Sequence, residues 1–383
     1  MESIIIFTNF ANRKITKDMK RHLLLLSSAL IIFSTAWADV EINETTFPDE
    51  NFRTWVLAQS YGQDGILTEE EIANVSRITV EGGRNIQSLK GIEYFTALTY
   101  LNCGSNHLSS LDVSNNTALM TLNCNNNHLS SLDVSNNTQL TKLNCGSNQL
   151  ISLDVTMNTA LTNLACSSNQ LTSLNTSNDI ALIMLSCNDN QLTELDVSNN
   201  VALTTLACQE NQLTTLDVSK NIALKILVCH DNHLTSINVS GCTALESFRC
   251  AGNKLAELDV SGCPALEDLI CMSNQIKGEA MDALVESLPT VNRGHLGVIN
   301  HTDEQNVMTK SQVAVAKAKG WYVQYNNNRN QWENYEGSDD PTGITSPLVE
   351  TEEGAIFDLQ GRKVQGKPSQ GIYIKDGQKI LAK

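Results

Sequence analysis

The chain has 383 residues, a formal net charge of −16, 18% charged residues and 5% aromatic residues. This balance is typical of a folded protein and not of a disordered one. An acidic chain without a basic stripe argues against nucleic acid and anionic membranes as partners. We therefore expect neither nucleic-acid binding nor insertion into a membrane.

The N-terminus has the pattern of a secretory signal. Residues 19–22 are basic, residues 23–33 are apolar, and residues 36–38 read Ala-Trp-Ala, with small residues where a signal peptidase reads. The apolar run is too short for a stable membrane span, which needs about 20 residues. Residues 1–38 are thus predicted to be a signal peptide with its true start at Met19, and the mature chain is expected to be secreted.

Residues 39–97 are predicted to form an N-terminal cap. The apolar spacing over 48–59 predicts a short helix that turns Trp55 toward the core. Apolar residues at 78–80 and 86–89 resemble a degenerate first copy of the repeat that follows. A cap is expected here because the end of a repeat array exposes apolar surface.

One segment of this cap is a candidate calcium site. The stretch from Asp64 to Glu71 resembles the second half of an EF-hand loop that would begin at Ser60. Ser60 and Gly62 stand where acidic ligands are expected, and Thr68 with Glu71 also fits a helix capping box without metal. Asp64, Thr68 and Glu71 are therefore the candidate ligands; no cofactor and no other metal site is expected.

Residues 98–274 consist of one sequence pattern that repeats every 21 residues, L-x-x-L-x-C-x-x-N-x-L-x-x-L-D-V-S-x-N-x-A. A fixed period of this size predicts a solenoid, in which each coil covers its neighbour. The repeat is marked by nine cysteines: Cys103, Cys124, Cys145, Cys166, Cys187, Cys208, Cys229, Cys250 and Cys271.

The pattern within a coil predicts its shape. Alternation at Leu101 and Cys103, and again at Leu111 and Val113, indicates two short parallel strands per coil with these side chains inward. A coil of 21 residues leaves no room for a helix between them. We expect a β-rich solenoid in the form of a flattened, gently curved rod.

The repeat resembles the leucine-rich repeat. Leu101, Cys103, Asn106 and Leu108 match the L-x-L/C-x-x-N-x-L core of that family. The second half of the coil, residues 111–116, follows the pattern L-x-L-x-x-N with Val113 in the place of the second leucine, so the array is similar to the short nested repeats of bacterial surface proteins in the family. The resemblance implies a binding module and not an enzyme.

The pattern lengthens after the repeats. Residues 275–334 are predicted to form a C-terminal cap with helices over 277–288 and 311–319, and strands over 295–299 and 321–325. Thr309 and Ser311 are the alternative N-caps of the second helix. This arrangement is typical of longer, helix-bearing repeats that close a solenoid.

The chain ends in a separate unit. Residues 335–354 are rich in Ser, Asp, Pro, Thr, Gly and Glu, which indicates a linker. Residues 355–383 are predicted to form a small β unit with motifs at 355–362 and 371–377. These motifs resemble the C-terminal sorting domain of the type IX secretion system, which implies export and anchoring at the outer cell surface.

Residues 21 places apart can be compared within the chain. The invariant cysteine column is interpreted as a buried ladder of free thiols, with disulfides or a metal as the alternatives. The invariant Asn106 column is expected to satisfy turn backbone groups. A second turn column carries two extra cysteines that could pair, and it reads Asn116, Asn137, Asn158, Asp179, Asn200, Asn221, Cys242 and Cys263.

The outside of the second predicted sheet is a line of carboxylates. We interpret it in one of two ways. The carboxylates either accept hydrogen bonds from neighbouring hydroxyls and keep the protein soluble (a hydroxyl-satisfied face), or they form a strip that binds cations. The line consists of Asp112, Asp133, Asp154, Asp196, Asp217 and Asp259, with Asn175 and Asn238 interrupting it.

The outside of the first predicted sheet varies from coil to coil, as a binding surface must. Ile226, Val228, Ile270 and Met272 are expected to form an exposed apolar cluster near the C-terminal repeats, unless the cap helices cover it. The predicted ligand-binding residues are Tyr100, Lys142, Met184, Ile226, Val228, His230, Arg249, Asp268, Ile270 and Met272.

These features favour a secreted or surface-displayed, adhesin-like module that acts as a monomer and binds a protein, on a host or a neighbouring cell. A structural surface component without a specific ligand is the alternative. A third reading, the accessory scaffold of an enzyme, would need a catalytic domain outside the repeats, and the remaining segments are short.

Overall fold

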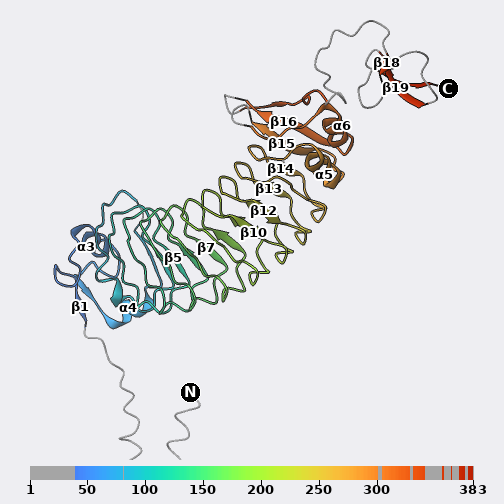
Figure 1. Cartoon of the computed structure of the whole chain (residues 1–383). Coiled ribbons are helices and arrows are strands. Elements are labelled where there is room, and N and C mark those ends of the chain that lie inside the picture. The colour runs from blue at the N-terminus through green and yellow to red at the C-terminus, as the bar shows by residue number, and fades with distance from the viewer. Residues whose placement is uncertain are drawn as a thin grey trace, which may run out of the picture.

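The computed structural model describes residues 39–80, 82–300, 304–327, 331–340, 356–357, 364, 371–375 and 378–382. The predicted signal peptide and most of the predicted linker lie outside these residues. The described chain forms a curved rod of stacked coils with a cap at each end (Figure 1). The predicted β-rich solenoid is confirmed, with a spacing of 21 residues between paired strands.

A 13-stranded sheet runs the length of the rod in the order β17-β16-β15-β14-β13-β11-β9-β8-β7-β6-β5-β4-β3. Neighbours pair in parallel and in register, as in Tyr100↔Thr121↔Lys142, and only β16 and β17 pair antiparallel. Its repeat strands are β3 (Arg77–Thr79), β4 (Tyr100–Asn102), β5 (Thr121–Asn123), β6 (Lys142–Asn144), β7 (Asn163–Ala165), β8 (Met184–Ser186), β9 (Thr205–Ala207), β11 (Ile226–Val228), β13 (Ser247–Arg249) and β14 (Asp268–Ile270). We call the outward side of these strands the first-sheet face.

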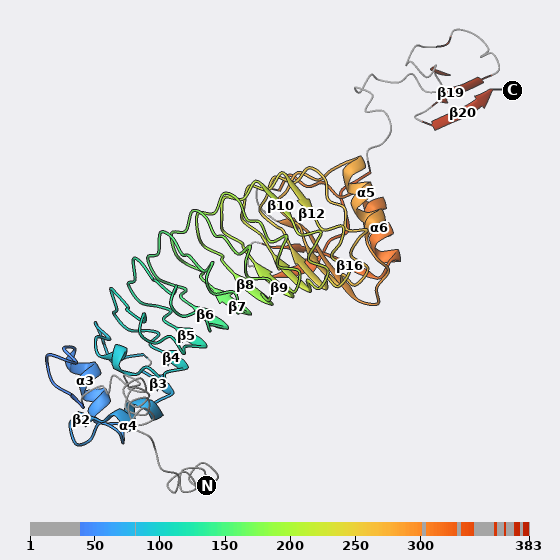
Figure 2. The same cartoon turned by 90° about the horizontal axis from the view of Figure 1, so that it is seen from below.

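The second predicted strand is present in only two described coils, as β10 (Thr215–Asp217) and β12 (Ser236–Asn238), on the opposite edge from the main sheet (Figure 2). The Val113 carbonyl accepts from the backbone of Asn116 and from the Asn137 side chain, and the equivalent Val218 carbonyl after β10 accepts from Asn221 and Cys242 in the same way. Gly241 and Gly262 both approach the preceding coil closely, at Ser219 and Ser240, but among the described coils a strand pair on this side forms only between β10 and β12.

The N-terminal cap closes the first coil. β1 (Val40–Glu41) pairs antiparallel with β2 (Ile66–Leu67), and α3 (Glu50–Leu57) buries Trp55 as predicted. Asp49 caps this helix and its second carboxylate oxygen accepts from the backbone of Gln87 and Ser88 in the first coil. The cap also contains α4 (Glu69–Asn74) and the 3₁₀ turn η1 (Ile92–Tyr94).

The C-terminal cap continues the sheet with β15 (Gly294–Asn300), β16 (Trp321–Asn326) and β17 (Trp332–Asn334). Helices α5 (Glu279–Ser287) and α6 (Lys310–Ala318) lie side by side at this end of the rod (Figures 1 and 2). Thr309 is the N-cap of α6 and forms a capping box with Gln312, which decides between the two predicted caps.

The predicted small C-terminal β unit is an antiparallel sheet of β18 (Ile356–Phe357), β19 (Gly371–Lys375) and β20 (Gln378–Ala382). Across the described part of the chain, no helix has the length and the apolar character that a membrane crossing requires.

Candidate functional site

The inward-facing columns stabilise the fold and offer a ligand few accessible or reactive groups. All eleven cysteines are free and buried, so the predicted thiol ladder is confirmed. Burial raises the pKa of the Cys103 thiol to about 12, which keeps it protonated and unreactive. The two extra cysteines also stay unpaired: the Cys242 and Cys263 thiols donate to the carbonyls of Val218 and Val239.

The first asparagine column satisfies turn backbone groups, as predicted. The Asn127 side-chain amide donates to the carbonyls of Cys103 and Cys124, and its oxygen accepts from the Leu108 backbone. Each coil is thereby fastened to the one before it. The same bonds recur through Asn274.

The second asparagine column has one member that breaks the ladder. Asn137 donates to the carbonyls of Val113 and Asn116, and its equivalents repeat this pair of bonds. Asp179 is fully buried in the same column, but neither carboxylate oxygen has a hydrogen-bond partner among the described residues. Burial raises its pKa to about 7. The sequence showed this exception, but its significance emerges only from the burial.

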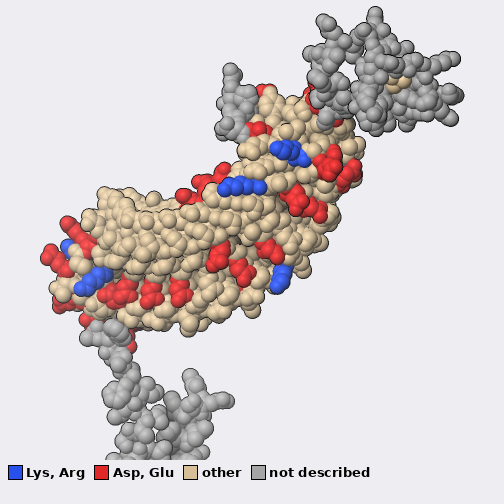
Figure 3. All heavy atoms as spheres, in the orientation of Figure 1, with Lys and Arg blue, Asp and Glu red and all other residues tan. Residues whose placement is uncertain are grey.

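The aspartate column on the second side forms turns within its own coils. Figure 3 shows acidic side chains in a row along one face of the rod. Asp112 Oδ1 accepts from the Ser114 backbone at 2.9 Å, and Asp133, Asp196 and Asp217 make the same bond. Hydrogen bonds from Ser114 lower the pKa of Asp112. These contacts favour the hydroxyl-satisfied interpretation over a cation strip.

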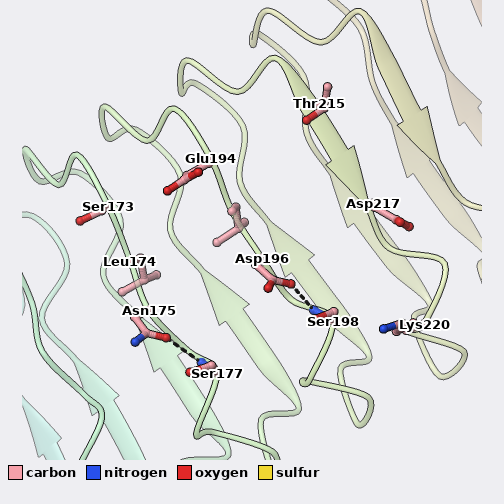
Figure 4. Close-up of a pocket in the computed structure, with 11 residues that line it drawn as sticks. Ser173, Leu174, Asn175, Ser177, Glu194, Asp196, Ser198, Thr215, Asp217 and Lys220 are labelled. Carbon is pink, nitrogen blue, oxygen red and sulfur yellow. Dashed lines mark hydrogen bonds between the residues drawn. The ribbon is translucent and has the colours of Figure 1, made fainter.

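An open groove crosses three coils of this face (Figure 4). Asn175 and Asp196 accept from Ser177 and Ser198 along its floor, and Lys220 lies at one end. The groove offers hydroxyls, carboxylates and one amine, without an aromatic ring to stack on a sugar. Its lining residues are Ser173, Leu174, Asn175, Ser177, Glu194, Leu195, Asp196, Ser198, Thr215, Asp217 and Lys220.

The first-sheet face presents the predicted residues in two rows of paired positions. One row runs through Tyr100, Lys142, Met184, Ile226 and Asp268, and the other contains Val228, Arg249 and Ile270. Lys142, Met184, Ile226 and Arg249 are exposed, with Met184 and Ile226 each 41% exposed. Tyr100 is half-buried, and the Arg77 guanidinium stacks 3.5 Å from its ring centre.

The apolar cluster is less exposed than the sequence predicted. Val228, Ile270 and Met272 are half-buried, which leaves Ile226 as its exposed member. A strand of the cap, not a helix, reaches the end of this face. A Cβ on Gly297 would lie 2.7 Å from the Trp332 ring and 3.5 Å from Ile270 Cγ2, so the ring and Ile270 flank the same glycine.

A polar cluster lies beside this apolar end. Asp268 accepts from His295 Nδ1 at 2.8 Å and Ser247 Oγ at 2.7 Å, and Arg249 lies 3.3 Å away. Burial raises the pKa of Asp268, but the bonds from His295 and Ser247 and the charge of Arg249 outweigh burial and lower it overall. His230 instead pairs with its neighbour Asp231 at 2.8 Å.

His295 and Trp332 were not predicted as parts of this cluster; their rings meet edge to face with centres 4.8 Å apart. A glycine within a predicted strand marks a close approach by another group, so Gly297 was the available signal. The cluster is not a hydrolytic triad, because Ser247 donates to Asp268 and not to His295.

The candidate calcium loop contains a capping box. The Thr68 hydroxyl accepts from the Glu71 backbone, and the Glu71 carboxylate accepts from the Thr68 backbone at 2.9 Å. Asp64 accepts from the Ile66 backbone. Within the described ranges, no three His, Cys, Asp or Glu side chains group closely enough to hold a metal ion. Glu71 thus caps the start of α4, as the alternative interpretation predicted.

Comparison with known proteins identifies relatives by structure. No protein-family model and no curated protein matches the sequence. The functional domain of InlJ from Listeria monocytogenes, which includes a cysteine ladder, is similar at 30% identity and a TM-score of 0.63, over 76% of this chain and 68% of that chain. A leucine-rich repeat protein of Leptospira interrogans has the same fold at 23% identity and a TM-score of 0.54, over 64% of each chain.

Three features of the structure agree with these similarities: the 21-residue register, the inward leucines and cysteines, and the asparagine ladder. The chain therefore belongs to the leucine-rich repeat family.

Proposed function

We propose that the chain is a protein-binding module that acts outside the cell and holds its partner on the first-sheet face. One observation carries the proposal: the outward positions of this face differ in chemistry from coil to coil and remain accessible. Lys142, Met184, Ile226 and Arg249 are all exposed there. A surface of this kind can discriminate between partners, because apolar anchors within a polar rim are the usual anatomy of an interface.

The aspartate face supports the choice by contrast. Its carboxylates accept hydrogen bonds from their own turns, so their repetition has a structural cause. A monotonous surface also offers a partner no unique register along the rod. The first-sheet face is the better recognition surface for both reasons.

The location outside the cell rests on the two ends of the sequence. The predicted signal peptide and the sorting-like tail favour secretion followed by anchoring at the outer surface, and an adhesin-like role follows from that location. With a net charge of −16, separate copies repel one another, which favours a monomer. A host or neighbouring-cell protein is the expected partner.

A structural surface component without a ligand is the competing function. An array of purified cell-surface proteins, matrix proteins and glycans, tested with the folded chain and with urea-unfolded chain, separates the two. Saturable binding of the folded chain to one or a few proteins supports the module. Retention on glycans alone, or on no member of the array, contradicts it. The enzyme-scaffold alternative is tested in the same preparation by activity screening.

A further inference from the structure

One junction between coils lacks a fastening that the others have. Every other member of the second asparagine column, from Asn116 to Cys263, donates a side-chain hydrogen bond to a carbonyl of the preceding coil. Asp179 makes no such bond among the described residues, although it is fully buried at the same position. The junction that it leaves unfastened lies between the coil of β7 and the coil of β8, and we call it the Asp179 seam.

The turn of Asp179 is held more firmly to the coil after it than to the coil before it. Asn200 Nδ2 donates to the carbonyls of Thr176 and Asp179, each at 2.9 Å, and Thr176 Oγ1 donates to Asn200 Oδ1 at 2.9 Å. Thr176 can donate because it stands in a column that is otherwise valine. In the opposite direction, the exposed Asn178 Nδ2 donates to the Thr156 carbonyl at 3.1 Å, outside the ladder. The buried side-chain bonds of this turn therefore point forward only.

The sheet side of the same junction is intact. Strands β7 and β8 pair in parallel and in register over their whole length. The first asparagine column also spans the junction, because Asn190 Nδ2 donates to the Cys166 carbonyl at 3.1 Å. The Asp179 seam is thus weak on its turn side and fastened on its sheet side, which is the arrangement of a hinge.

No charged side chain of the adjoining described turns faces Asp179. These turns, residues 154–161 and 196–203, carry one titratable residue each, Asp154 and Asp196, and both are exposed and accept hydrogen bonds within their own turns. Burial alone raises the pKa of Asp179, from 3.8 to about 7. A carboxylate at this position has no cation and no donor to stabilise it inside the rod, so it gains solvation when the turn opens.

We propose that Asp179 makes this junction a pH-dependent hinge of the rod: its turn separates from the preceding coil as the pH rises toward and above neutrality, while β7 and β8 stay paired. Water then reaches the carboxylate at the open seam. In a solenoid each coil contacts only its neighbours, so one weakened junction opens locally without unfolding the coils on either side. Opening on the turn side alone changes the bend of the rod between its two halves.

Native-state hydrogen exchange of the full chain tests the proposal, because each amide reports the opening of its own turn. The reporters are the backbone amides of Asp179 and Leu182, which donate within the turn to the carbonyls of Thr176 and Asp179. The equivalent amides of an ordinary turn, those of Asn221 and Leu224, are the internal control. Between about pH 5 and about pH 8, after correction for intrinsic exchange, the opening constant at the seam should rise about a hundredfold, because the open turn releases a proton that the closed turn keeps. The control turn should not respond.

Three variants separate a hinge from general destabilisation. Asp179→Asn should abolish the pH response of the seam, and Asp196→Asn should keep it, because Asp196 is exposed. The double variant D179N/N137D moves the buried carboxyl to another member of the column and should move the pH-dependent opening to the turn of Asn137. The proposal is overturned if all turns open equally as the pH rises, if the seam does not respond, if Asp179→Asn retains the response, or if the double variant does not transfer it. None of these substitutions alters the first-sheet face, so failure here leaves the proposed function standing.

Discussion

Asp179→Asn should stabilise the protein, and the gain should depend on pH. In the native chain this carboxyl is fully buried without a partner among the described residues, and its pKa is raised from 3.8 to about 7. Burial is the only cause of the shift. The folded state therefore retains the proton of Asp179 through a pH range in which the unfolded chain has already lost it.

The direction of the effect follows from this difference in proton binding. As the pH rises from about 4 to about 7, the wild type loses stability through Asp179, because the folded state must either keep the proton or bury a charge. A shift of about 3 pKa units corresponds to about 4 kcal/mol above both values and to less than about 1 kcal/mol near pH 4. Asparagine would also donate two hydrogen bonds to the ladder, whereas a protonated carboxyl can donate only one. The additional bond contributes about 1 kcal/mol to the stability of the variant.

The assay is urea unfolding of wild type and variant at about pH 4 and about pH 8, followed by circular dichroism under reducing conditions. Asp179→Asn should raise the free energy of unfolding by about 3–5 kcal/mol at the higher pH and by about 1 kcal/mol at the lower. Asp196→Asn is the control: Asp196 is exposed and its pKa is lowered by Ser198, so its effect should be small and of opposite sign at high pH. A gain from Asp179→Asn that is equal at both pH values, or a loss of stability, would refute the reasoning.

Three further outcomes follow from the same contacts. Thiol titration of the native chain should find few reactive groups, and denaturant should release eleven, because burial raises every cysteine pKa in the ladder; disulfides between ladder cysteines in a mass spectrum would contradict this. Removing residues 341–383 should leave the thermal melt of the repeats unchanged while altering delivery to the cell surface, and normal surface display without the tail would argue against a sorting role. Excess calcium should leave the melting temperature unchanged because Glu71 serves the capping box, so calcium-dependent stabilisation that Glu71→Gln abolishes would restore the metal site.

Much of the fold could be predicted because the repeat constrains every coil in the same way. The period places each strand, and the inward alternation at Leu101 and Cys103 identifies the core. The second strand was harder, because the same alternation recurs in every coil but only β10 and β12 pair among the described residues. No pattern within one coil distinguishes these two coils from the others.

The candidate site was predicted less completely, for a physical reason. At the end of the first-sheet face, Trp332 lies beside Gly297, which also neighbours Ile270, although Trp332 comes 62 residues after Ile270 in the chain. Such long-range coverage leaves no trace in the repeat columns.

The most direct test of the proposed binding face uses the partner protein that the array identifies. Its dissociation constant is measured for two double variants of the chain, one on each face. Ile226→Asp with Met184→Asp should weaken binding at least about tenfold and leave the melt intact, because both side chains are exposed on the first-sheet face and the variant places charge there. Asp133→Asn with Asp217→Asn should change little beyond the salt dependence. If the aspartate pair abolishes binding and the first-sheet pair does not, the partner binds the other face and the central claim is wrong.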